Sequence, residues 1–214
     1  MPKFIHIDGS ALTLAFLQRV SSEDNFATYT FASQNLGTAS ADRRIVVGVR
    51  GNAAGGGTVS SATIGGVSAT IHINNGAANG STATISAIVP SGTTGDIIIT
   101  WSTTQNECGI VAYSIKGETS ATPEFALSDL TTPLDITPTI LGNTAVIAHS
   151  ACRHPSIPIE CDWAGSLGVI ENTDSLFASS VHSSASLLTS GSGNITATYT
   201  DGVTPFALHV IGWK

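Results

Sequence analysis

Residues 95–116 read GDIIITWSTTQNECGIVAYSIK, and residues 193–214 read GNITATYTDGVTPFALHVIGWK. The two stretches align without a gap at a constant offset of 98 residues, which places Trp101 on Tyr199. Both alternate apolar and polar residues, cross a polar turn and continue into a second apolar run. Self-similarity at a fixed offset predicts two related units within one chain. We therefore expect Trp101 and Tyr199 at equivalent packing positions.

The same alignment places Gly95 on Gly193, and these glycines are expected at matching turns before a strand. Elsewhere, runs rich in Val, Ile, Thr and aromatic residues alternate with Gly, Asn, Ser or Pro clusters. About seven such runs per unit is the strand count of a β-sandwich. The sequence therefore predicts an all-β fold of two related sandwiches in tandem, Ig-like or jelly-roll-like. One pseudo-symmetric sandwich, or a single barrel built from both halves, fits the same pattern. Helical periodicity appears only at 11–20 and, weakly, at 174–186.

The repeat also suggests how the chain is divided. We expect an N-terminal assembly segment at 1–25, a first sandwich at 26–117, a linker at 118–133 and a second sandwich at 134–214. The linker region has two prolines and three acids and lacks strand alternation. The N-terminal segment contains the apolar run ALTLAFL, which needs a partner surface. We therefore expect this segment to pack on a neighbouring subunit rather than join either sandwich.

The charge balance narrows the function classes. Only 11% of the 214 residues are charged, well below the roughly 25% of typical globular domains, and the formal net charge is −7. Lys and Arg total 8 and form no basic stripe, so nucleic-acid binding is not expected. No stretch approaches the ~20 apolar residues of a membrane span, and the N-terminal run is interpreted as structured chain rather than a signal peptide. Such a weakly charged chain suits a larger assembly.

Three cysteines, Cys108, Cys152 and Cys161, are too few for a disulfide scaffold. Cys108 lies in an apolar strand pattern, which is typical of a small buried hydrophobe. A chain folded in a reducing cytoplasm is the simplest interpretation, and a bridge between Cys152 and Cys161 in an oxidising medium stays open.

The densest cluster of reactive groups is AHSACRHPSIPIECDW, which contains His149, Cys152, His154 and Cys161. Zinc accepts two imidazoles and two thiolates tetrahedrally. The spacing H-x2-C-x-H-x6-C matches no standard finger or ribbon, however, and two prolines favour an extended loop. We therefore predict no metal here and no cofactor for the chain.

The same loop supplies the candidate ligand-binding residues Arg153, Asp162 and Trp163. A Trp beside charged groups on a loop can form a sugar platform, because pyranose rings stack on indoles and carboxylates accept sugar hydroxyls. The competing interpretation, which carries more weight, is that Trp163 anchors the core of the second unit.

Catalytic signatures are not evident. The sequence has no G-x-S-x-G elbow and no G-K-[ST] phosphate loop. A glycosidase needs two converging carboxylates, and the repeat pairs Asp96 with Asn194, which lacks that group. His72 and His209 lie in strand patterns with apolar neighbours and are interpreted as half-buried structural residues. We therefore expect a protein that is not an enzyme.

Four blocks, ADRRIVVGVRG, ATIGGVSATI, VPSGTTGDIIITWS and CGIVAYSIKG, follow one another between residues 41 and 117. Their order and spacing resemble a family of phage and prophage β-rich virion proteins, over 26–117 well and over the second half weakly. The resemblance implies a tail, fibre or capsid-decoration component that is assembled in the host cytoplasm and carried on the virion. Its expected partners are copies of itself and other virion proteins. The alternative function is a carbohydrate-binding module that attaches to host-surface glycans. No functional residue transfers with the resemblance, because the matched positions are strand residues and turn glycines.

Overall fold

The structure is a computed structural model that describes residues 11–53, 56–77, 80–153, 160–177, 180–200 and 205–214. These residues form strands joined by turns and loops, and none of them lies in an α-helix. No helix long and apolar enough to cross a membrane therefore occurs in the described part of the chain. The predicted all-β fold class is confirmed.

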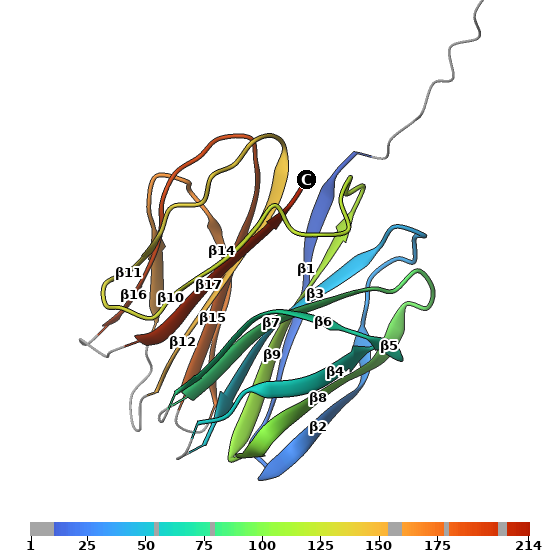
Figure 1. Ribbon diagram of the computed structural model, residues 1–214, viewed down its shortest axis with the longest axis vertical. Coiled ribbons are helices and arrows are strands. Elements are labelled where there is room, and N and C mark those ends of the chain that lie inside the picture. Colours follow the sequence, from blue (N-terminus) through green and yellow to red (C-terminus); the bar gives the residue numbers. More distant parts are fainter. Residues whose placement is uncertain (1–10, 54–55, 78–79, 154–159, 178–179, 201–204) are drawn as a thin grey trace, which may run out of the picture.

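The first unit is a sandwich of two antiparallel sheets. Its strands are β1 (Thr13–Ser22), β2 (Phe26–Asn35), β3 (Arg44–Asn52), β4 (Val59–Ile64), β5 (Val67–Ser68), β6 (Thr70–Ala77), β7 (Gly80–Ile88), β8 (Thr94–Gln105) and β9 (Glu107–Lys116). Sheet A has the order β1-β9-β3-β7-β6, and sheet B has the order β2-β8-β4-β5. The blue-to-green strands of this unit lie together in Figure 1.

The second unit repeats this plan in the yellow-to-red half of the chain (Figure 1). Its strands are β10 (Phe125–Asp129), β11 (Leu134–Ile136), β12 (Thr144–Arg153), β13 (Cys161–Ala164), β14 (Ile170–Phe177), β15 (Ser180–Thr189), β16 (Ile195–Tyr199) and β17 (Pro205–Trp213). Sheet C has the order β10-β17-β12-β15-β14, and sheet D has the order β11-β16-β13. Strand for strand, sheet C matches sheet A and sheet D matches the first three strands of sheet B.

Details of register support this correspondence. The pairing of β6 with β7 shifts between Ile71 and Ile73, and the pairing of β14 with β15 shifts between Glu171 and Thr173. A bulge at the same place in both units is a feature of a shared fold rather than a local defect. The two units are therefore versions of one structural design.

The aromatic pair of the repeat occupies equivalent places, as the offset predicted. Trp101 on β8 pairs with Val59 on β4, and Tyr199 on β16 pairs with Cys161 on β13. Both aromatic side chains are buried, each in the core of its own sandwich. The matching glycines lie near the starts of equivalent strands, but Gly95 is the second residue of β8 rather than a residue of a preceding turn, whereas Gly193 lies just before β16.

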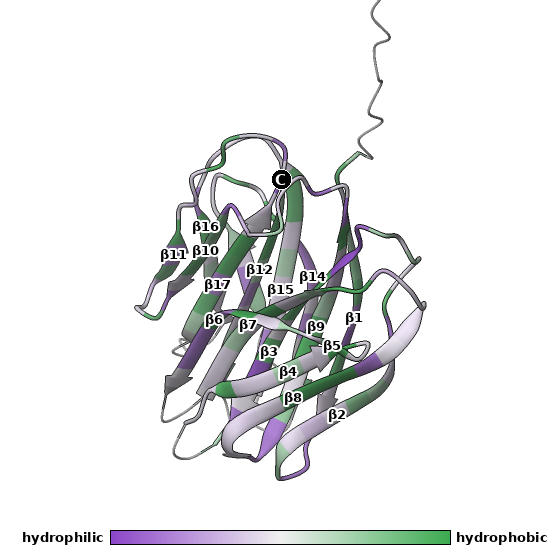
Figure 2. Ribbon diagram, turned by 45° about the vertical axis from the view of Figure 1, so that its right-hand side comes forward, coloured by the Kyte–Doolittle hydropathy of each residue, from purple (hydrophilic) through white to green (hydrophobic). Residues whose placement is uncertain are grey.

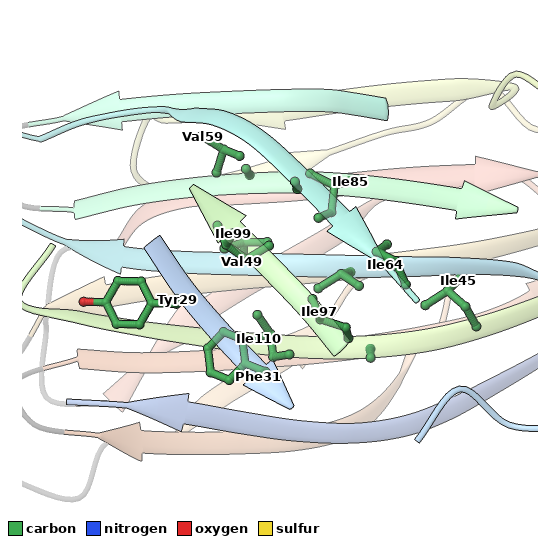
Figure 3. Packing of buried hydrophobic residues seen from close by; sticks show 14 of the residues in the cluster. Tyr29, Phe31, Ile45, Val49, Val59, Ile64, Ile85, Ile97, Ile99 and Ile110 are labelled. Carbon is green, nitrogen blue, oxygen red and sulfur yellow. The ribbon is translucent and has the colours of Figure 1, made fainter. Parts of the chain in front are cut away.

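Each sandwich has its own apolar core. Figure 3 shows the first core, where side chains from β2, β4 and β8 meet those from β3, β7 and β9. The second core lies between sheets C and D. In Figure 2 a continuous green stretch in the middle of β8 marks its contribution, with pale and purple stretches beside it. One Trp accompanies each core: Trp101 in the first and Trp163, partly buried, in the second.

A third apolar cluster joins the two units. It contains residues from sheets A and C, namely Val46, Val111, Tyr113, Ile115, Ala145, Ile147, Ile211 and Trp213. The outer faces of sheets A and C therefore pack on each other, which gives four layers in the order B, A, C, D. This explains why β3 is buried along its whole length, whereas β8 alternates between buried and exposed residues.

The packing of sheet A on sheet C is pseudo-symmetric. Strand β1 contacts β14 and β15, and β6 contacts β10 and β17. Because β10 is the counterpart of β1 and β14 is the counterpart of β6, each edge of the interface repeats the other. This is the arrangement of an isologous two-fold contact, built here within one chain.

Two predicted boundaries are wrong. Residues Thr13–Ser22, assigned to a separate assembly segment at 1–25, form β1 and pair with β9 from Cys108 to Lys116. Apolar side chains here find their partner within the chain, since Leu14 and Phe16 of β1, and Leu12 just before it, pack against the cluster between the units. The apparent helical periodicity at 11–20 was also misleading. It arises because a bulge near Leu17 interrupts the two-residue alternation of β1. Residues 1–10 of that segment lie outside the described residues.

The predicted linker at 118–133 is also partly sheet. Strand β10 lies inside it and pairs with β17. Just before it, Glu118 accepts two hydrogen bonds from Arg44, at 2.6 and 2.7 Å, and both side chains are almost fully buried. This stretch is therefore held against both units. The weak helical signal at 174–186 falls on β14 and β15.

Candidate functional site

The three predicted ligand-binding residues lie around the end of β12 and on β13. Arg153 is the exposed last residue of β12 and pairs with Ser180. Asp162 and Trp163 are neighbours on β13, where successive side chains point to opposite faces of the sheet. The structure therefore does not bring the indole of Trp163 and the carboxylate of Asp162 together on one surface.

Trp163 points inward. Trp163 pairs with Ala197 on β16, just as Ala62 pairs with Ile99 at the equivalent place in the first unit. Its side chain packs against the second core. Its indole N–H donates a hydrogen bond of 2.7 Å to Ser183 Oγ. A Trp whose ring faces the core and whose polar atom is bonded internally is an anchor of the sandwich.

Asp162 points outward and lines an acidic pocket of about 550 Å³. The pocket lies where the end strand of sheet D meets the end strand of sheet C. Its described lining is Glu160, Cys161, Asp162, Glu171, Asp174 and Thr200. The rim is tied together by backbone, since Thr200 N–H donates to the Glu160 carbonyl oxygen at 3.1 Å.

The carboxyl groups of this pocket influence one another. Burial raises the pKa of Glu171, and the negative charges of Asp174, Glu160 and Asp162 raise it further. Burial also raises the pKa of Asp174, against the opposing effect of hydrogen bonds from Ser183 and the Cys161 N–H. Carboxyls with raised pKa values in a pocket occur at many active sites and equally in structural networks.

The first unit shows which interpretation suits Asp174. Its counterpart is Asn74, whose Oδ1 accepts from Val59 N–H at 3.0 Å and whose Nδ2 donates to the Val59 carbonyl at 2.9 Å. Asp174 Oδ2 accepts from Cys161 N–H at 2.8 Å, the equivalent bond. In both units this side chain therefore ties one sheet of the sandwich to the other. Asp174 has a structural task that does not require a ligand.

The remaining thiol in the pocket wall is no nucleophile. Burial raises the pKa of Cys161 well above its usual range, and its side chain belongs to the second core. A thiol that stays protonated at neutral pH lacks the thiolate needed for attack or metal binding.

The described members of the candidate set His149, Cys152, His154 and Cys161 do not all come together. His149 and Cys152 both lie on β12, but His149 is buried between the units while Cys152 is part of the second core. They therefore face opposite sides of sheet C. His154 lies outside the described residues. Within the described ranges, no group of three or more His, Cys, Asp or Glu side chains is placed to hold a metal ion.

A second polar cluster lies between sheets A and C, beside the apolar one. It contains three buried histidines on adjacent strands, His149, His182 and His209, each about 1% exposed. At its end, Arg50 Nη2 lies 3.8 Å from Glu107 Oε1, and Ser180 hydrogen-bonds to both groups. These groups bind one another across the two units.

Comparison with protein-family models, curated proteins and solved structures found no match. The resemblance to phage virion proteins therefore rests on the sequence blocks alone.

Sequence reasoning missed most of both clusters. His209 lies in a strand, as its apolar neighbours predict, but it is fully buried rather than half-buried, and His182 does not stand out among the neighbouring serines. The available signal was that β12, β15 and β17 are each nearly free of charge on the face that carries the histidine. Which strands lie side by side could not be read from the chain.

Proposed function

We propose that the protein is a non-enzymatic structural component of a bacteriophage virion, of the tail, fibre or capsid-decoration type, which acts through contacts between subunits. The observation that carries this proposal is that one β-unit packs on a second version of itself through the outer face of its five-stranded sheet. A unit that associates with its own kind is suited to repeating assemblies.

The placement of the cations supports the proposal. Arg43 donates to three backbone carbonyls, those of Val89, Gly37 and Ser91. Arg44 is held by Glu118, and Arg50 is buried beside Glu107. Three of the cations near the N-terminal end therefore serve the fold instead of presenting a charged surface to nucleic acid.

Several large apolar side chains remain exposed for contacts with other subunits. They include two on β14, an edge strand of sheet C: Ile170 is 64% exposed and Leu176 is 50% exposed. Edge strands with exposed apolar residues are places where further chains can pair. We expect copies of this chain and other virion proteins as the partners.

The direct test is mass spectrometry of purified particles from the source, together with the neighbouring genes. Presence of the polypeptide in stoichiometric amounts supports the proposal, and particles without it overturn it. For the purified chain, light scattering should detect oligomers that Ile170→Lys with Leu176→Lys dissociates. Leu141→Lys, at a residue 74% exposed elsewhere on the surface, is the matched control and should leave the oligomer intact.

Glycan attachment is a second candidate, favoured by one observation. The acidic pocket presents carboxylates, including Asp162, that can accept hydrogen bonds from sugar hydroxyls. The inward orientation of Trp163 removes the stacking platform from this version of the site. A glycan array with wild type and Asp162→Asn tests it, and an array without hits on the wild type excludes it.

A further inference from the structure

The three buried histidines are joined by a continuous hydrogen-bonded path that crosses the interface. Thr84 Oγ1 on β7 lies 2.9 Å from His149 Nε2 and 3.0 Å from His209 Nδ1. His149 Nδ1 lies 3.2 Å from His182 Nε2. At the other end, His209 Nε2 lies 2.9 Å from Asn75 Nδ2 and 3.0 Å from Thr82 Oγ1. We call this set the histidine chain.

Asn75, at one end of the histidine chain, determines which atom donates and which accepts in each of its hydrogen bonds. The amide nitrogen of Asn75 can only donate, so His209 Nε2 accepts and the proton of His209 sits on Nδ1. His209 then donates to Thr84, and the Thr84 hydroxyl donates to His149 Nε2. His149 carries its proton on Nδ1 and donates to His182.

Every link therefore requires a neutral imidazole with one donor and one acceptor nitrogen. A second proton on His149 would place two donors against each other at Thr84 or leave that hydroxyl without an acceptor. Burial also disfavours the charge: it lowers the pKa of His149 to about 3 and lowers those of His182 and His209 well below the usual value. The rings of His149 and His209 are 4.7 Å apart, so two charges there would also repel.

The surrounding charged and titratable groups come from several strands. Sheet A contributes Arg50 from β3, Glu107 and Tyr113 from β9, His72 from β6 and Arg19 on β1 at the edge. Strand β7 contributes the hydroxyls of Thr82 and Thr84. The positive charge of Arg50 acts against protonation of His182, together with that of His149. Glu107 is itself engaged with Arg50, Ser180 and Asn52.

We propose that the histidine chain is a pH-operated joint, which holds the two sandwich units together at neutral pH and releases them on acidification while each unit keeps its own core. The apolar end of the interface, around Trp213, is closed when the histidine chain is neutral. It becomes accessible to solvent when the histidine chain is charged. The joint lies between the sandwiches, and neither sandwich core contains one of these histidines.

The direction of the effect follows from proton binding. The closed state binds fewer protons than the open one, so closure is complete above the ordinary histidine pKa of about 6.5 and is lost as the pH falls. Each histidine that is neutral when closed and charged when open raises the opening constant about tenfold per pH unit below that value. Three histidines give up to about a thousandfold per unit.

The positions of the three Trp residues make the opening measurable in the full-length chain. Trp213 lies in the cluster between the units, whereas Trp101 and Trp163 belong to the two sandwiches. In a chain with Trp101→Phe and Trp163→Phe, emission and acrylamide quenching report Trp213 alone. We expect its emission to shift to longer wavelength and quenching to rise several-fold between pH 6 and about 4, while far-ultraviolet circular dichroism stays constant.

Two variants in this background separate a titrating chain from a merely structural one. His149→Gln with His182→Gln keeps hydrogen-bonding groups that do not titrate, so the pH dependence of opening should lose about two protons per molecule. Thr84→Val breaks the chain but removes no titrating group, so opening should begin at higher pH with an unchanged slope.

Three results would overturn the proposal: exposure of Trp213 only together with loss of β-structure, an unchanged slope in the double glutamine variant, or a buried Trp213 down to pH 4. If the double variant does not fold at pH 7, His182→Gln alone should lose about one proton. The experiment is independent of the proposed virion role, because it uses the purified chain and no partner.

Discussion

Gly48 and His149 occupy equivalent positions in the two units and lie against each other at the centre of the interface. Gly48 on β3 pairs with Val111 and Thr84, and His149 on β12 pairs with His209 and Ser184, its counterparts in the second unit. A Cβ placed on Gly48 would lie 2.8 Å from the His149 ring. A contact between two equivalent residues marks a pseudo-two-fold axis, and here one partner had to be Gly so that the other could carry an imidazole.

Gly48→Ala should destabilise the chain by about 1–3 kcal/mol, since the new methyl group would overlap the His149 ring and Val111 in packed surroundings. Chemical denaturation followed by circular dichroism measures the loss. Gly142→Ala is the control, because its Cβ would meet nothing within 4 Å, and it should change stability by less than about 0.5 kcal/mol. Equal effects of the two substitutions would contradict the close contact.

Trp163→Ala should reduce the stability of the protein and not its binding of a ligand. Removal of fully buried Trp or Phe side chains costs about 3–5 kcal/mol, and partial exposure of Trp163 places the expectation near the lower end. The loss of the bond to Ser183 adds to it. Thermal denaturation of the variant gives the magnitude. If the variant were as stable as the wild type and had lost glycan binding, Trp163 would instead be the surface platform for sugars that the sequence suggested.

Glu107→Gln should destabilise the protein by about 3 kcal/mol, because it leaves the buried charge of Arg50 without its counterion. Burial lowers the pKa of Arg50 to about 10, against the opposing influence of Glu107. The comparison is Lys214→Met, which breaks an ion pair with Glu124 whose Lys side chain is 40% exposed. That loss should stay below about 1 kcal/mol in the same denaturant titration. Similar costs for both would mean that the Arg50 charge is solvated.

The sequence predicted the architecture well where periodicity carried the information. The ungapped repeat located β8, β9, β16 and β17, and it predicted the equivalent positions of Trp101 and Tyr199 in the two units. The division at the N-terminus was wrong because an apolar edge strand and an apolar assembly arm have the same composition. What distinguishes them is a partner, β9, almost one hundred residues away in the chain.

The site was harder to predict, because residues adjacent in the chain separate in a sheet. Asp162 and Trp163 look like one site in the sequence and lie on opposite faces of β13. In contrast, His149, His182 and His209 are far apart in the chain and lie side by side once sheet C forms. Sheet order, which depends on long-range pairing, decided both outcomes.

The thiols should react slowly in the native protein. Burial raises the pKa of both Cys108 and Cys152 to about 12, and it also raises the pKa of Cys161. Because the thiolate is the reactive form, labelling at pH 8 should be at least about 100-fold slower than in denaturant. Colorimetric thiol titration gives both rates. Fast labelling of one thiol under native conditions would show an exposed Cys, and non-reducing mass spectrometry would reveal a Cys152–Cys161 bridge in oxidised samples.

Asp174→Asn should stabilise the second unit by making it resemble the first. An amide at this position can accept from Cys161 N–H and also donate to the Cys161 carbonyl, as Asn74 does with Val59. It also removes a charge from a pocket where burial and the neighbouring Glu160 raise the pKa of Asp174. A net gain of about 0.5–1.5 kcal/mol is expected at pH 7.

The pH dependence provides the check on this last prediction. A carboxyl whose pKa is raised on folding destabilises the folded state at pH values above its unfolded pKa. The gain in stability from Asp174→Asn should therefore be largest near pH 7 and shrink as the pH falls towards 4. Asp162→Asn, at an exposed position of the same pocket, should give a smaller gain at both pH values. If Asp174→Asn lowers stability at pH 7, the carboxylate has a partner that the comparison of the two units does not reveal.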